Sequence, residues 1–382
     1  MSPLGRLQKS RKRGSVKRRK SQRKGGQVTR ARTRRMNGGR MVENAVLFVG
    51  SGFSIPARFP NWMALLQELA RRTRDPDIIR QADSVSWDSG ELYALAQTIR
   101  DHENGEWINT QLEEILQPTG WPVNKEMQER LDLIRELDSH SLLDGILTTN
   151  YDLFFRGPAP LCTSEEEKKQ VAMAFSDLLD SEQWRSRDNG RKYGISDGEQ
   201  PGDYLPSRAP IIQIHGNTKC TIGTSVVLTT QSYDELKAVP GYMSTMQDIF
   251  NSKTVIFIGY SLTDDYVREL VQNSNGQKAI VLMPQRDIHN FKRQHRKNRR
   301  LLDRINFIEL PDFDDGTLAK IIRNKIFPWL SKINNRPSSP VSVLNQYDIL
   351  SRIGSNQSGG RRRKHRKTKK RKSNKRKTKK RR

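Results

Sequence analysis

Short segments rich in apolar residues alternate with longer amphipathic segments along most of this chain. The short segments lie at 45–49, 145–149, 211–215, 225–230, 255–258, 279–282 and 306–309. Apolar runs of this length, bounded by turn residues, are typical of strands. Strands that are apolar almost throughout and are separated by helices favour a sheet that is covered on both faces. The pattern therefore predicts an α/β fold, with a Rossmann-like, mainly parallel sheet and helices on both faces.

The amphipathic segments predict the helices. From Trp62 to Ala70, apolar residues recur three and four positions apart, and Asn61 stands where an N-cap is expected. Similar segments lie at 92–99, 108–116, 125–139, 164–180, 232–250 and 315–333. Several of these helices fall between the first two strands, which predicts a helical insert over about 61–140.

Two further segments have a local interpretation. Residues 181–210 are rich in Gly, Pro, Asp and Arg and show little periodicity, so a loop or lid is predicted there. Thr263-Asp264-Asp265 directly follows a predicted strand and its turn, and this triplet predicts a helix N-cap with acids in the first turn.

The net charge of +27 is concentrated at the two ends of the chain. Residues 1–40 hold 16 Lys and Arg, residues 361–382 hold 17, and neither segment has an acid. The remaining 36 basic residues face 42 acids, so residues 41–360 carry about −6. Highly charged segments with few apolar residues cannot bury a core. Both ends are therefore predicted to be disordered tails.

The tails also predict partners. Dense Lys and Arg neutralise phosphates and form motifs that import receptors read. No aromatic residue is interleaved with them, so binding of nucleic acid is expected to be independent of base sequence. We expect non-specific nucleic acid or an import receptor as partner, and an intracellular location in the cytoplasm, the nucleus, the nucleolus or a virion.

Cysteine content and hydropathy argue against a zinc site rich in cysteine, against secretion and against a membrane protein. Cys162 and Cys220 are the two cysteines, too few for a Cys₄ or Cys₃His zinc site, so no zinc is expected. Two cysteines in a chain of this size fit a reducing compartment with buried or idle thiols. No segment approaches 18 apolar residues, and the N-terminus is too basic for a signal peptide. No membrane partner is expected.

Polar residues directly follow three of the predicted strands. The sequence Gly50-Ser51-Gly52-Phe53-Ser54 follows the first strand, Asn150-Tyr151-Asp152 the second and His215-Gly216 the third. Open α/β sheets bind nucleotides at the carboxyl ends of their strands. Each motif alone also has a plain structural interpretation, as a glycine turn, as Asn and Asp turn formers or as a structural histidine. Because the three motifs are expected at the same edge of the sheet, they predict a nucleotide-binding site that catalyses a reaction.

The sequence lacks the motifs of two common classes of nucleotide-binding enzyme, the dehydrogenases and the P-loop enzymes. A dehydrogenase fingerprint needs a third glycine, but position 55 is Ile, and no clear second strand places an acid about 20 residues further on. No Gly-Lys-Ser/Thr sequence of a P-loop is present. Hydride transfer and P-loop phosphoryl transfer are therefore disfavoured.

The motifs occur in an order that resembles the sirtuin superfamily. Three motifs are more similar to those in the sirtuin-like domains of NAD-degrading defence proteins than to those in the protein deacylases. They are Phe59-Pro60-Asn61-Trp62, Thr148-Thr149-Asn150-Tyr151-Asp152 and Phe257-Ile258-Gly259-Tyr260-Ser261-Leu262. The resemblance covers about 44–310 and implies NAD as substrate.

The resemblance also implies residue roles. Asn150 would hold the nicotinamide ribose and the attacking water, His215 would be the general base, and Asp152 would contact the nicotinamide amide. Gly50, Gly52 and Ser54 would bind the phosphates, and Gly259 and Ser261 the adenosine side. The full cofactor-binding set so implied is Gly50, Ser51, Gly52, Ser54, Asp152, Gly259 and Ser261.

Departures from the family pattern change the expected reaction. Met63 stands where deacylases have Arg, Ser51 stands where Ala is usual, and only Cys220 follows the His-Gly pair where a zinc ribbon needs four cysteines. We therefore expect an NAD⁺ hydrolase that releases nicotinamide and ADP-ribose. Two alternatives stay open: a catalytically weak nucleotide-binding body of a nucleic-acid-associated protein, and an NAD-dependent deacylase or ADP-ribosyltransferase. A homo-oligomer also stays open.

The expected domain organisation follows from these patterns. The basic tail at 1–40 precedes one sirtuin-like NAD-binding domain at 41–333, and a linker with a short element at 334–360 leads to the second tail at 361–382.

Overall fold

The computed structural model describes residues 45–86, 89–116, 122–162, 164–180, 193–200, 202–218, 226–275, 278–311 and 317–334. All of them belong to one compact unit, Met41–Arg382. Both predicted tails, and the predicted linker beyond its first residue, lie outside the described residues. No helix among the described residues is long and apolar enough to cross a membrane.

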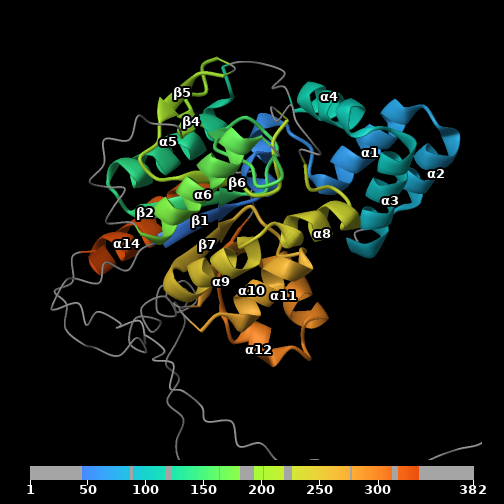
Figure 1. The fold of residues 1–382 in the computed structure, drawn as a ribbon. Helices are drawn as coiled ribbons and strands as arrows, with labels where there is room; N and C mark the ends of the chain where they lie inside the picture. The colour runs from blue at the N-terminus through green and yellow to red at the C-terminus, as the bar shows by residue number, and fades with distance from the viewer. Residues whose placement is uncertain are drawn as a thin grey trace, which may run out of the picture. The chain divides into compact units, whose positions relative to one another are not determined.

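A six-stranded parallel sheet forms the centre of the unit (Figure 1). Its strands are β1 (Ala45–Val49), β2 (Leu143–Thr148), β6 (Ile211–Gln213), β7 (Thr254–Ile258), β8 (Ala279–Pro284) and β9 (Ile305–Leu310). The spatial order is β6-β2-β1-β7-β8-β9. This is the order of a doubly wound dinucleotide-binding sheet, in which the connections diverge between two neighbouring central strands. Here those strands are β1 and β7, and ligands are expected at their carboxyl ends.

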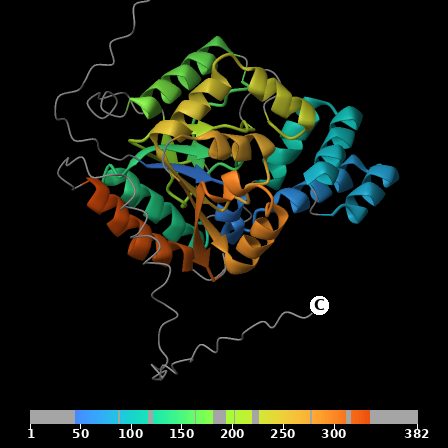
Figure 2. The same ribbon diagram turned by 90° about the horizontal axis from the view of Figure 1, so that it is seen from below.

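Helices cover both faces of the sheet (Figure 2). One face packs against α5 (Lys125–Ser139), α13 (Thr317–Ile321) and α14 (Phe327–Asn334), and the other against α6 (Glu165–Leu179), α9 (Tyr242–Ser252) and α10 (Asp265–Asn273). Along β1, Leu47 and Val49 belong to the first core, and Val46 and Phe48 to the second. This alternation explains why the strand is apolar throughout, and the predicted α/β fold is confirmed.

Four helices between β1 and β2 lie beside the sheet (Figure 1). They are α1 (Trp62–Thr73), α2 (Pro76–Ser84), α3 (Ser89–His102) and α4 (Gly105–Ile115). Asn61 caps α1 as predicted, because its side chain accepts a hydrogen bond from Ala64 N. The periodicity did not predict α2, which begins with Pro76 after the capping side chain of Asp75. The last helix of the predicted insert, α5, belongs instead to the sheet's covering layer.

Several predicted elements need correction. The expected strand at 225–230 is wrong: of its described residues only Val226 pairs, through a single bridge to Gly216, and α8 (Thr230–Ala238) follows. The expected helix at 232–250 is two helices, α8 and α9. Pro240 lacks an N–H, and Gly241 adopts φ +78 as the N-cap of α9, so the chain turns between them.

The predicted loop at 181–210 contains strands. Within it, β4 (Gly194–Ser196) and β5 (Tyr204–Pro206) pair with β3 (Phe155–Arg156) in a small antiparallel sheet. The part at 181–192 lies outside the described residues.

Cys162 is disulfide-bonded, so the expected idle thiol is wrong at that position. Near the end of the unit, a π-helical turn at Ile322–Ile326 joins α13 to α14 where one helix was expected.

Candidate active site

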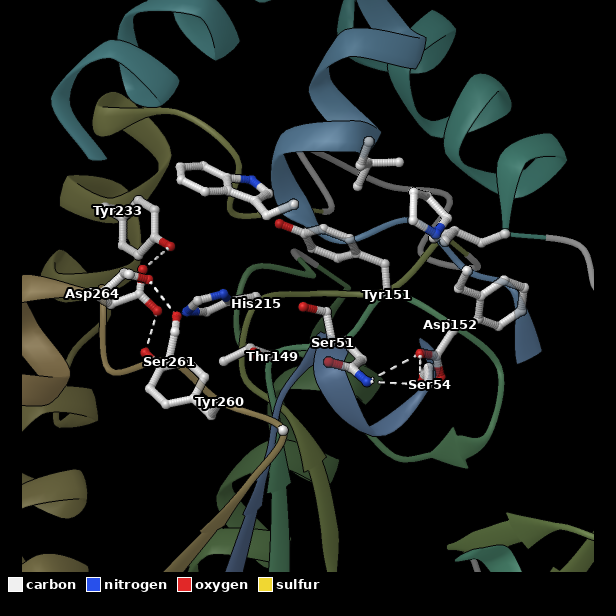
Figure 3. A pocket seen from close by; sticks show the side chains of 18 residues that line it. Ser51, Ser54, Thr149, Tyr151, Asp152, His215, Tyr233, Tyr260, Ser261 and Asp264 are labelled. Atoms are coloured by element: carbon white, nitrogen blue, oxygen red, sulfur yellow. Dashed lines mark hydrogen bonds between the residues drawn. The ribbon is translucent and has the colours of Figure 1, made fainter. Parts of the chain in front are cut away.

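A pocket opens at the carboxyl ends of β1, β2 and β7, where the sheet topology predicts a ligand. Its cavity volume is about 100 Å³. Figure 3 shows Asp152 and Ser54 on one side of the pocket and Tyr233 and Asp264 on the other, with His215 between them. The predicted site residues that line the pocket are Ser51, Ser54, Asn150, Asp152, His215, Gly259 and Ser261. The structure therefore brings together residues from all the predicted strand-end motifs.

Asn150 is held by a buried hydrogen-bond network. Its Nδ2 donates to Ser54 Oγ and to Asp152 Oδ2, each at 3.1 Å, and Ser54 Oγ donates to Asp152 Oδ2 at 2.6 Å. The carboxylate of Asp152 only accepts, so the amide must present its nitrogen to it. Asn150 Oδ1 is then left buried, and it has no hydrogen-bond partner among the described residues. The residue lines the pocket and carries a buried acceptor that no described residue satisfies.

The carboxylate of Asp152 accepts hydrogen bonds from three neighbouring residues. Its Oδ1 accepts from Phe154 N at 3.2 Å, while Oδ2 accepts from Ser54 and Asn150. Burial raises the pKa of Asp152, and the hydrogen bonds from Ser54, Phe154 and Asn150 oppose that rise. The carboxylate fixes the amide orientation of Asn150. Its expected contact with the nicotinamide amide stays a prediction.

Gly50 and Gly52 let two strand ends approach closely. A Cβ on Gly50 would lie 2.6 Å from Gly259 O, and one on Gly52 would lie 3.0 Å from the same atom. Gly50 N donates to Ile258 O and Gly52 N to Gly259 O, both at 2.9 Å. These N–H groups hold β1 to β7, and neither glycine lines the pocket. The expected contact of the two glycines with NAD phosphates stays a prediction.

Gly259 is expected to be the least replaceable of these glycines. It adopts φ +66, and a Cβ there would lie 2.2 Å from Phe53 N. Gly259→Ala should therefore lower the free energy of unfolding by more than the ~1–2 kcal/mol of left-handed strain alone, as measured by urea denaturation. Gly202→Ala is the matched control, because Gly202 has φ +90 with nothing within 4 Å of its Cβ position. Equal losses in both variants would contradict the close approach.

A buried arginine supports the turn after β1. Arg130 of α5 is 1% exposed, and its Nη1 donates to Gly52 O at 3.1 Å and to Phe53 O at 2.8 Å. Its Nη2 donates to Glu126 Oε1 at 2.6 Å. Spacing on α5 gave no sign of this role, because an arginine in a predicted helix usually faces water.

His215 is 4% exposed and faces several aromatic side chains. Its Nε2 lies 3.0 Å from Tyr266 Oη, and its ring meets that of Tyr233 edge-on, with centroids 5.2 Å apart. Burial lowers the pKa of His215, and the nearby charge of Asp264 opposes that shift. In the tautomer that carries its proton on Nε2, His215 donates to Tyr266 and keeps Nδ1 as a basic acceptor. The site therefore favours a neutral imidazole.

Asp264 gathers three tyrosine hydroxyls. Its Oδ1 accepts from Tyr93 at 2.9 Å and from Tyr233 at 2.6 Å, and its Oδ2 accepts from Tyr260. The predicted N-cap position is right, but the Asp264 side chain does not cap α10, because its oxygens bind these hydroxyls. Tyr93 belongs to α3, so this carboxylate ties the helical insert to the body at the rim of the pocket.

Asp264→Ala would leave three hydroxyls without their acceptor in a mostly buried setting. An unsatisfied buried polar group costs about 1–3 kcal/mol, so we expect a loss of stability of at least about 3 kcal/mol in urea denaturation. Asp265→Ala is the matched control. That neighbour is exposed and pairs on the surface with Arg268, so it should lose less than about 1 kcal/mol. Similar losses in the two variants would contradict the anchoring role of Asp264.

The insert supplies an apolar wall. Trp62 and Leu65 of α1, with Leu116 just after α4, line the pocket opposite the strand ends. Met63 packs against the hydrophobic core and does not line the pocket. No group of three His, Cys, Asp or Glu side chains that could hold a metal occurs in the described part of the chain. Cys220 lies outside that part, and the expected absence of zinc stays a prediction.

Comparison with protein families matches residues 144–307 to the SIR2-like domain. The match runs from β2 into β9 and includes Asn150, Asp152, His215, Gly259 and Ser261. It begins after the 50–54 turn, which the structure nevertheless places against Gly259. A comparison with curated proteins gave no match. Residues 144–307 of this chain match the SIR2-like domain, and this match suggests an NAD-using enzyme.

Proposed function

We propose that the protein hydrolyses NAD⁺ at the bond between nicotinamide and ribose and releases nicotinamide and ADP-ribose. The observation that supports this most is the buried Oδ1 of Asn150, which has no hydrogen-bond partner within the described residues although Nδ2 is doubly bound. A buried acceptor without a partner is costly, by about 1–3 kcal/mol. A ribose hydroxyl or a water molecule in the pocket would satisfy it.

The proposed reaction divides the work between two side chains. The C1′–N1 bond breaks and its electron pair leaves with nicotinamide, which departs neutral because it is cationic in NAD⁺. The oxygen of a water molecule then bonds to C1′. Asn150 orients the ribose and that water, and His215 takes the proton that the water loses. This differs from ordinary glycoside hydrolysis, where a carboxylic acid must protonate the leaving group.

The pH dependence of turnover follows from the surroundings of His215. A base must be neutral, and burial lowers the pKa of His215 below its usual 6.5. Turnover should therefore stay high as the pH falls through 6.5 and should decline only at lower pH, measured as kcat against pH. A decline centred at or above pH 6.5 in the wild-type protein would contradict a buried, neutral base.

Hydrolysis is preferred to deacylation because of the residue at position 63. Met63 stands at the position of the deacylase arginine, and it packs into the core away from the pocket. Incubation of the purified protein with NAD⁺ and an acetyl-lysine peptide tests the preference by chromatography. We expect free ADP-ribose whether or not the peptide is present. O-acetyl-ADP-ribose, or ADP-ribose attached to protein, would overturn the hydrolase assignment, and NAD⁺ that is bound but not consumed would favour a binding body.

A further inference from the structure

A strongly basic surface lies on two consecutive helices and the turn between them, and none of its residues lines the pocket. The helices are α11 (Gln285–Gln294), which lies beside α10 in Figure 1, and α12 (Arg299–Leu302), which lies below it. Ile288, Phe291 and Leu301 anchor the two helices in the core. The exposed cations that we call the basic surface are Arg286, Lys292, Arg293, Arg296, Lys297, Arg299 and Arg300.

The charge of this segment is opposite to that of the rest of the body. Residues 285–304 hold eight Lys and Arg against two Asp, which is about +6. Residues 41–360 as a whole carry about −6, so the remainder of that region carries about −12. Twenty residues therefore concentrate positive charge on an otherwise acidic body.

The cations of the basic surface also differ from those elsewhere in the described chain. On several other helices, exposed cations pair with acids one turn away, as Arg80 does with Asp77 and Lys168 with Glu165. No cation of the basic surface forms an ion pair with a described residue. Arg293 donates to Asn290, and Lys292 lies over the ring of Phe307. Unpaired like charges this close in sequence repel one another, so an anionic partner would stabilise them.

We propose that the basic surface binds the phosphate backbone of duplex nucleic acid. Five of its seven cations are arginines, whose planar guanidinium matches phosphate oxygens. A ten-residue helix is about 15 Å long, a length over which a duplex presents roughly nine charges.

The chemistry of the same helices disfavours a membrane. Helices that lie on a membrane insert an exposed apolar side. The apolar side chains of α11 and α12 pack into the core, and the exposed large hydrophobic residues of the described chain are Met173 and Leu205, on neither helix. No Phe, Tyr or Trp side chain is exposed on α11 or α12 for base stacking, so binding is independent of base sequence.

The test must separate this surface from the basic tails, so it uses the full chain and two matched variants. The first variant neutralises the basic surface, with Arg293→Gln, Arg296→Gln, Arg299→Gln and Arg300→Gln. The control removes the same number of exposed cations from other helices, with Arg80→Gln, Lys125→Gln, Lys168→Gln and Lys237→Gln. Affinity for a 40-base-pair DNA duplex is measured by fluorescence anisotropy over a range of salt concentrations, with thermal melting as the check on folding.

Each phosphate contact contributes about 0.9 to the slope of log affinity against log salt concentration. We expect the first variant to lower that slope by about 3–4 and the control to leave it unchanged within about one. In hydrogen exchange of the wild-type chain, the duplex should protect 285–304. Equal slopes in both variants, or no protection of 285–304, would overturn the proposal. So would a first variant that binds DNA normally but loses binding to phosphatidylserine vesicles. None of these readouts depends on NAD⁺ turnover.

Discussion

His215→Ala is expected to lower NAD⁺ turnover by roughly 10²–10⁴-fold, the usual contribution of a general base. The imidazole is buried, its pKa is lowered by that burial, and its Nε2 lies 3.0 Å from Tyr266 Oη. These features keep a neutral base beside the pocket. Alanine removes it, and the proton of the attacking water then has no acceptor. Steady-state kinetics should show the loss in kcat, with little change in the KM for NAD⁺.

Tyr266→Phe tests the contribution of the tyrosine hydroxyl beside His215 separately from that of the imidazole itself. The variant keeps the His215 ring but removes the hydroxyl that lies 3.0 Å from Nε2. We expect a smaller loss of turnover than in His215→Ala, because the imidazole ring and its Nδ1 remain in place. A His215→Ala protein that melts like the wild type and still turns over NAD⁺ at the wild-type rate would contradict the assignment of the base.

Asn150→Ala is expected to cost about 10²-fold or more in turnover, because it removes the side chain that orients the ribose and the water. The three-way network with Ser54 and Asp152 holds this side chain in one orientation. Its Oδ1 is the buried acceptor that no described residue satisfies. The loss should appear in kcat measured by nicotinamide release, and circular dichroism should show an intact fold.

Ser54→Ala is the matched control for this network. It removes one of the two acceptors of Asn150 Nδ2 but leaves the other, Asp152 Oδ2, in place. The amide should therefore stay nearly oriented, and the expected loss is about tenfold, the effect of ~1.4 kcal/mol. If Ser54→Ala were as damaging as Asn150→Ala, the Oδ1 acceptor would not be the important atom.

The parallel sheet, and the edge of it at which the site lies, could be predicted from the sequence. Burial of the strands determines their apolar sequences and therefore where they end. The strands β1 and β7 are covered on both faces, so their sequences are apolar throughout and easily found. Once the sheet is parallel, polar residues that end its strands must meet at one edge. Asn150, Asp152 and His215 therefore share a pocket, as predicted.

Residues whose roles depend on distant partners could not be predicted. Asp264 looked like an ordinary N-cap, since its tyrosine partners at positions 93, 233 and 260 meet it only through tertiary packing. Arg130 has a local i, i+4 partner in Glu126, but its contacts to the turn at 52–53 join segments far apart in sequence. The short strands β4 and β5 carry too few residues for a period to be visible.

The central claim is hydrolysis of NAD⁺ at the Asn150 and His215 site. Its most direct test is the ratio of free ADP-ribose to nicotinamide that the purified protein forms from NAD⁺ alone, quantified by chromatography beside Asn150→Ala. We predict one ADP-ribose for each nicotinamide in the wild-type protein and about 10²-fold less of both products in the variant. Nicotinamide without matching free ADP-ribose, or equal product formation by Asn150→Ala, would contradict the claim.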